Sequence, residues 1–141
     1  MSSILQGQTT SFKLGLYNGQ FNLATDTIKM ALYNGNATLN QTTTAYSSVN
    51  EITGTGYTAG GQTMSGVTIN YDAVNSVVYV NFANVIWSPA NFTARCALIY
   101  DATASNASIA VIDFGSDKTC TNTFTVTMPA NTYSTALIRS A

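Results

Sequence analysis

Short runs in which apolar and polar residues alternate recur along this chain, and turn-forming residues separate each run from the next. The clearest are residues 28–33 (IKMALY), 92–100 (FTARCALIY) and 123–128 (TFTVTM). Alternation with a period of two is the pattern of a β-strand that buries one face. No stretch keeps the periodicity of an amphipathic helix over three turns. We therefore predict an all-β fold, a single-domain antiparallel β-sandwich or barrel, jelly-roll-like, of about seven or eight strands.

The expected strands differ in how completely they are buried. Residues 77–86 (VVYVNFANVI) are apolar at odd and even positions alike, which predicts a central strand covered on both faces. Residues 92–100 are expected to bury one face, formed by the even-numbered positions. Residues 50–63 contain four glycines and predict a long loop or bulged ribbon. The full set of expected strands is 12–16, 28–33, 67–71, 77–86, 92–100, 109–114, 123–128 and 135–138.

The domain organisation follows from where the alternation begins. Residues 1–11 are polar apart from Ile4 and Leu5, and they predict an extended N-terminal arm or a weakly held tail. As an arm, the segment is expected to become ordered on an adjacent subunit. The β-sandwich domain is expected over residues 12–141, which is long enough for one hydrophobic core.

The composition limits the chemistry that the chain can perform. It has no histidine, five Lys or Arg residues and six Asp or Glu residues. Histidine is the usual general base and the commonest metal ligand. We therefore predict that the protein is not an enzyme, and we assign no catalytic, cofactor-binding or metal-binding residues. Cys96 is expected to act as a small buried hydrophobic residue, and Cys120 lacks a histidine to activate it.

The carboxylates lie next to turn residues, which indicates local structural roles. Asp113 and Asp117 are expected to accept hydrogen bonds from nearby backbone, and a calcium site built from them with backbone carbonyls is the alternative. The others are expected to be solvated or to cap turns; they are Asp26, Glu51, Asp72 and Asp101.

The distribution of charge argues against nucleic acid and membrane partners. The five cations are isolated in the sequence, and the formal net charge is −1. No apolar run reaches the roughly 18 residues of a membrane helix, and residues 1–12 do not have the pattern of a secretory signal. We expect synthesis in a cytoplasm, where Cys96 and Cys120 remain free thiols.

Glycine and tyrosine supply the remaining candidate features. The glycine-rich segment lacks the Lys-Ser/Thr of a phosphate-binding loop, so we interpret Gly54, Gly56, Gly60 and Gly61 as backbone bends. Several tyrosines are expected at strand ends or in loops, where they can fill the core, contact other subunits or form a carbohydrate pocket. These tyrosines are Tyr17, Tyr33, Tyr46, Tyr57 and Tyr133.

Five sequence blocks follow one another in order and cover most of residues 11–129. They are 11–35, 42–64, 85–102, 110–119 and 124–129, and they include the unusual strings NEITGTGYTAGG, ARCALIY and VIDFGSDKT. In order and spacing, these blocks resemble a family of small β-rich bacteriophage virion structural proteins. Cys96 departs from the small residue expected at its position in that family.

The resemblance implies a virion component that is assembled in the host bacterial cytoplasm. A capsid decoration or cement protein is the leading role, with the phage major capsid protein and further copies of this chain, as a trimer or other homo-oligomer, as partners. A tail, neck or fibre component, or a module that binds host glycans, is the alternative. The family brings no catalytic residues to this chain.

Overall fold

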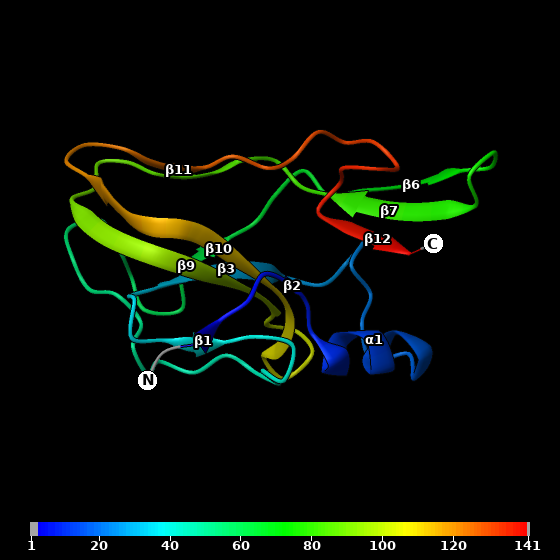
Figure 1. Cartoon of the computed structure of the whole chain (residues 1–141), viewed down its shortest axis with the longest axis horizontal. Helices are drawn as coiled ribbons and strands as arrows, with labels where there is room; N and C mark the ends of the chain where they lie inside the picture. The colour runs from blue at the N-terminus through cyan, green and yellow to red at the C-terminus, as the bar shows by residue number, and fades with distance from the viewer. Residues whose placement is uncertain (1–2, 141) are drawn as a thin grey trace.

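The computed structural model describes residues 3–140 and confirms the predicted all-β antiparallel sandwich (Figure 1). The described part contains twelve strands, more than the expected seven or eight, and eight of them have three or more residues. The elements are β1 (Ser3–Ile4), β2 (Gly7–Gln8), α1 (Thr10–Tyr17), β3 (Ile28–Tyr33), β4 (Thr38–Leu39), β5 (Gln62–Thr63), β6 (Thr68–Asp72), β7 (Val77–Asn81), β8 (Val85–Trp87), β9 (Phe92–Asp101), β10 (Ala107–Cys120), β11 (Phe124–Val126) and β12 (Ile138–Ser140).

The core lies on both faces of a five-stranded sheet with the order β2-β10-β9-β3-β5. Ala97 and Ile99 of β9 pack into a large apolar cluster on one face, whereas Leu98 and Tyr100 pack into a smaller cluster on the other. The prediction that residues 92–100 bury only one face is therefore wrong, because this strand buries both faces. Both faces are buried because segments of the chain cover the sheet on each side.

The strand β9 also changes face partway along its length. Phe92 and Ala94 belong to the large cluster, but Cys96 belongs to the small one. The change coincides with a register shift in the partner strand β10 between Asp113 and Lys118. An irregularity of this kind bends a strand and redirects its side chains, so strict alternation fails here.

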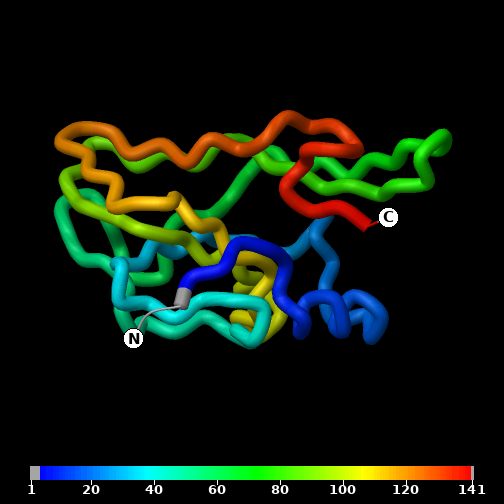
Figure 2. Tube along the Cα trace, viewed as in Figure 1, coloured from blue at the N-terminus to red at the C-terminus, as the bar shows by residue number. Residues whose placement is uncertain are grey.

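Three smaller sheets accompany the central sheet in the described residues, and one of them is the short parallel pair of β1 and β4. β8 pairs with β11, whose Phe124 and Val126 point inward as the alternation predicts. The other sheet has the order β12-β7-β6, and the hairpin of β6 and β7 extends beyond the central sheet toward one end of the molecule (Figure 2). The expected last strand is present as an edge strand, but it begins at Ile138 rather than at residue 135.

Residues 12–16 form helix α1, not the predicted strand. The side chain of Thr9 accepts a hydrogen bond from the backbone nitrogen of Phe12 at 3.2 Å, which caps the helix. Phe12 and Gly15 face the core three residues apart, while Leu14 is exposed. The apolar alternation did not predict the helix because two of its three apolar residues, Leu14 and Leu16, are exposed to solvent.

Residues 77–86 form two strands in two sheets, not one central strand. The chain bends at residues 82–84, where Phe82 enters the core and the side chain of Asn84 accepts a hydrogen bond from Met128 N at 2.7 Å. The side chain of Val78 is half exposed, so β7 is not covered on both faces. The break cannot be recognised from apolar content alone, because both halves are rich in β-branched residues.

The described part of the predicted N-terminal arm packs on its own chain. Gly7 and Gln8 pair with β10, and β1 pairs in parallel with β4. The expected boundary after residue 11 falls inside α1, because the cap at Thr9 starts the helix earlier. Residues 1–2 of the proposed arm lie outside the described residues. The single described helix is far too short to cross a membrane.

Candidate functional site

The hairpin of β6 and β7, with the loop at its tip, carries an exposed apolar face that we call the ribbon face. It consists of Ile69, Tyr71 and Val78, whose side chains are 49%, 75% and 49% exposed. Tyr71 lies directly opposite Val78, and Ile69 lies opposite the buried Val80. Ile69 and Tyr71 lie on one side of β6, as alternation predicts. That side is buried at Val80 of the neighbouring strand but remains largely exposed at Ile69, Tyr71 and Val78.

An open apolar groove separates the ribbon face from helix α1. Its lining includes Leu16 of α1, Phe21, Ile69, Val78 and Ile138, and its volume is about 420 Å³. We call these five residues the apolar groove.

Helix α1 adds further exposed apolar side chains. Leu14 and Tyr17 are 63% and 92% exposed. Tyr17 lines a neighbouring hollow of about 510 Å³ together with Leu16 and Val78, and the cations Lys13 and Arg139 also line this hollow. A concentration of exposed apolar side chains around one opening is typical of a protein interaction surface.

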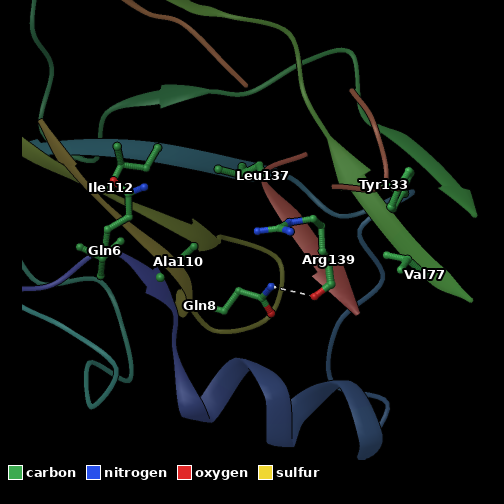
Figure 3. A pocket seen from close by; sticks show the side chains of 10 residues that line it. Gln6, Gln8, Val77, Ala110, Ile112, Tyr133, Leu137 and Arg139 are labelled. Carbon is green, nitrogen blue, oxygen red and sulfur yellow. Dashed lines mark hydrogen bonds between the residues drawn. The ribbon is translucent and has the colours of Figure 1, made fainter. Parts of the chain in front are cut away.

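A second cleft lies between the central sheet and β12 (Figure 3). Its volume is about 400 Å³, and its polar lining residues are Gln6, Gln8, Tyr133 and Arg139. The side chain of Gln8 donates a hydrogen bond to the backbone oxygen of Arg139 at 3.2 Å, which ties β2 to β12. Among the described residues the guanidinium group of Arg139 has no carboxylate partner.

The structure separates the tyrosines that the sequence analysis grouped. Tyr17 lies at the hollow beside the apolar groove, and Tyr133 lies at the second cleft. Tyr33 is buried, and Tyr46 and Tyr57 are half-buried in the interior near Glu51. The interior group is part of the core, so only two of the five tyrosines remain accessible for a partner.

The interior tyrosines surround the carboxylate of Glu51, which is not the solvated or capping residue expected. Tyr46 donates to Oε1 at 2.6 Å, and Tyr57 donates to Oε2 at 2.5 Å. The backbone nitrogen of Gly60 also donates to Oε2, at 2.7 Å. Burial, followed by the hydrogen bond to Glu51, raises the pKa of Tyr46 and Tyr57 above the ordinary tyrosine value. Glu51 therefore fastens the glycine-rich loop to the sheet.

Of the two candidate calcium residues, Asp113 has structural partners. The carboxylate of Asp113 forms an ion pair with Arg95 and accepts a hydrogen bond from Gly115 N at 2.8 Å, which confirms its expected bond to local backbone. This bond lowers the pKa of Asp113, with a contribution from Arg95. Within residues 3–140 no group of three or more potential ligands gathers around a metal position.

The two cysteines lie in different parts of the core and are free. Burial raises the pKa of Cys96 to about 12. Thiolates, not thiols, are nucleophiles, so Cys96 is unreactive at neutral pH.

The carboxyl groups of Asp101 and Asp26 interact, and a proton on one of them allows a hydrogen bond between the two. Asp101 is fully buried, and its Oδ1 accepts from Thr103 N at 2.9 Å and Ala104 N at 3.0 Å, so it does cap a turn. Its buried Oδ2 has no donor within the described chain other than a proton shared with Asp26. Burial, and then the bond to Asp26, raises the pKa of Asp101 to about 6, whereas the bond to Asp101 lowers the pKa of Asp26.

We expect Asp101→Asn to stabilise the protein at pH 7.5. The folded-state pKa of Asp101 lies above its ordinary value of 3.8, so the free energy of unfolding falls as pH rises from about 4 to about 6. An amide keeps the Oδ1 acceptor, donates to Asp26 and has no charge to bury. At about 1.4 kcal/mol per pKa unit, the gain is on the order of 1–3 kcal/mol. Urea unfolding at pH 4.5 and 7.5 measures it.

The partly buried turn residue Asp72 offers a matched control, because Asp72→Asn alters a carboxylate that also caps a turn. It should change stability little and equally at both pH values. If Asp101→Asn lost as much stability at pH 7.5 as at pH 4.5, the shared proton would be disproved.

Comparison with known proteins found no matching family model, no similar curated protein and no similar solved structure. Evidence about the function of this chain therefore comes from its surface and its sequence.

Proposed function

We propose that this chain is a non-enzymatic structural protein of a bacteriophage virion, and that it decorates or cements the capsid in many copies. Its partners are the major capsid protein and further copies of itself. The observation that carries the proposal is the apolar groove with the adjoining ribbon face. The sequence blocks that resemble phage virion proteins supply the biological setting.

The character of the surface supports an assembly role. Interface centres are depleted of charge and enriched in aromatic residues. The apolar groove is lined by Leu16, Phe21, Ile69, Val78 and Ile138, none of which is charged. A repeated contact in a shell gains strength from the number of copies, so each contact can be modest. A chain with few charges can bury such a surface without leaving an unpaired charge away from water.

The placement of the polar groups supports a role without catalysis. Glu51, Asp101 and Asp113 each accept hydrogen bonds from backbone nitrogens of their own chain. Their geometry serves loop and turn structure. In the described part of the chain, a nucleophile is not paired with a general base in either cleft.

The location of the protein in intact virions tests the proposal. Cryo-electron microscopy of particles purified from an infected host should place this chain repeatedly over the icosahedral shell. Quantitative mass spectrometry should give a copy number that follows the major capsid protein. Density confined to the tail or neck would contradict the capsid role.

We expect the double variant Leu16→Asp/Val78→Asp to lose its place on the particle. Two carboxylates in a buried apolar contact would remain unpaired, and each 1.4 kcal/mol lost costs tenfold in affinity. Copy number in particles complemented with the variant should fall at least tenfold. Val74→Asp is the matched control, since Val74 is 93% exposed at the hairpin tip and does not line the groove. Equal occupancy of the two variants would exclude the groove as the contact.

The second cleft favours one alternative, a tail, neck or fibre component that binds host glycans. Gln6, Gln8, Tyr133 and Arg139 provide amide, phenol and guanidinium groups of the kind that bind sugar hydroxyls and carboxylates (Figure 3). Few copies per virion, together with density at the tail, would favour this role.

A further inference from the structure

We propose that β6 pairs with β6 of a second copy of this chain, antiparallel and across a two-fold axis at Asn70. This inference rests on the proposed assembly role, because it names the surface by which two copies join. Its test needs only the purified chain, so it can fail or succeed independently of the location in virions.

The outer side of β6 is an open sheet edge. β6 is the last strand in the order β12-β7-β6, and it pairs with β7 over all five residues without a register shift. Among the described residues no other strand and no loop backbone bonds to its outer side. The segment Thr68–Asp72 (TINYD) contains no lysine, proline or bulge. Lysine residues, prolines and bulges are features by which soluble proteins normally prevent an edge strand from pairing with another chain.

One edge of the central sheet, formed by β2 and β10, has features that hinder pairing with another chain and that β6 lacks. β2 covers only Ala110 and Val111 of β10. Beyond them β10 carries a register shift, an ion pair between Asp113 and Arg95, and the exposed Lys118. A bulge and charged side chains block edge-to-edge contact there. The difference between the two edges indicates that β6 is left open for a partner.

The sequence of β6 is chemically self-complementary about its centre. Antiparallel pairing at Asn70 places Asn70 opposite its own copy, Ile69 opposite Tyr71, and Thr68 opposite Asp72. Aromatic residues opposite β-branched residues are favourable cross-strand pairs. The single charge faces a hydroxyl group, whereas a register centred on Asp72 would place two carboxylates opposite each other. Asn70 therefore marks the favoured register.

This pairing also explains the exposure of the ribbon face. Residues directly opposite each other in an antiparallel pair point to the same side of a sheet. The six strands of two copies would thus bring both sets of Ile69, Tyr71 and Val78 onto one continuous face. The two apolar grooves would open on that face, ready to contact a larger partner.

A disulfide cross-link at the two-fold axis tests the register. In Asn70→Cys the two thiols lie on directly opposed residues, whose Cα separation of about 4.5–5.5 Å permits a disulfide. Mild oxidation should convert most of the variant into a covalent dimer. The natural cysteines are buried, so the unaltered chain should stay uncross-linked. Ala73→Cys is the matched control, since its two copies would lie roughly 20 Å apart in this register.

Sedimentation of the purified chain provides the second measurement. The unaltered chain should reach about twice its mass of 14.9 kDa at high concentration. Tyr71→Lys, which changes an exposed side chain on the edge, should weaken the dimer at least tenfold while leaving the circular dichroism spectrum unchanged.

A monomer at all concentrations would overturn the inference. Equal cross-linking of the two cysteine variants, or a dimer that Asn70→Cys does not cross-link, would overturn it as well. If the purified chain formed this dimer but was absent from virions, the β6 pairing would be upheld and the proposed virion function would be rejected.

Discussion

Gly61→Ala is expected to destabilise the protein by about 3–6 kcal/mol, which is enough to unfold many single domains. Gly61 has a φ of +80°, where a residue with a side chain costs about 1–3 kcal/mol. A Cβ at this position would overlap the backbone carbonyl of Met30 and approach Ala31. Both neighbours belong to β3 in the middle of the core, so forced displacement adds a similar or larger cost. Urea unfolding monitored by tryptophan fluorescence measures the change.

The adjacent Gly60 separates the steric effect from the conformational one. Its φ is +95°, but an added Cβ would meet only side-chain atoms of Lys29 and Tyr100 at 3.4 Å. Gly60→Ala should therefore cost about 1–3 kcal/mol, the conformational part alone. If the two variants lost the same stability, the close approach of Gly61 to β3 would not be what requires glycine there.

For these glycines the backbone conformation was predictable from the sequence, whereas their tertiary contacts were not. The glycine-rich segment was interpreted as backbone bends, and Gly54, Gly56, Gly60 and Gly61 all have positive φ. The composition of the segment therefore predicted its backbone. Contact with Met30 could not be predicted, because the two residues lie on different elements and only the tertiary fold brings them together.

Strand identity was predictable where packing agrees with local pattern. Residues 28–33 and 124–126 form strands as expected. Residues 124–126 bury the face that their alternation marks, whereas residues 28–33 bury both faces. Residues 12–16 do not, because the cap at Thr9 precedes the run and the core needs Phe12 and Gly15 on one helical face. A pattern of three apolar residues fits both periods, so the capping residue decides.

The candidate site was less accessible to sequence reasoning than the fold. Ile69, Tyr71 and Val78 have the same pattern as residues of a buried face. Their exposure depends on which segments cover the sheet, and that is a property of the whole fold. Glu51 was missed for a related reason, since its donors Tyr46 and Tyr57 are neither adjacent to it nor in a recognisable motif.

Glu51→Ala should have the second large effect, a loss of about 3–5 kcal/mol in the free energy of unfolding. The substitution leaves the hydroxyl groups of Tyr46 and Tyr57 and the backbone nitrogen of Gly60 without their acceptor. Hydrogen bonds to a charged group contribute about 1.5–3 kcal/mol each, and partial access of water reduces the total. The glycine-rich loop should also become more mobile, which faster amide hydrogen exchange at Gly60 would report.

Glu51→Gln is the matched variant, because it keeps the shape and one acceptor oxygen but removes the charge. We expect a loss of about 1–3 kcal/mol, smaller than for Glu51→Ala. The two variants also differ from the unaltered chain at alkaline pH. Burial and the carboxylate of Glu51 raise the pKa of Tyr46 and Tyr57 in the folded state. Unfolded tyrosines ionise near pH 10, so the stability of the unaltered chain falls as pH rises above 10.

The carboxylate supplies part of this pKa shift and burial supplies the larger part. The fall in stability above pH 10 should therefore begin with the same slope in Glu51→Gln, but it should level off at a lower pH, where the reduced folded-state pKa is reached. Urea unfolding at a series of pH values from 8 upward gives the pH at which each fall levels off. Identical curves over the whole range would mean that the charge of Glu51 does not act on the tyrosines. Equal losses for the alanine and glutamine variants at pH 8 would mean that the charge, rather than the acceptor geometry, holds the loop to the sheet.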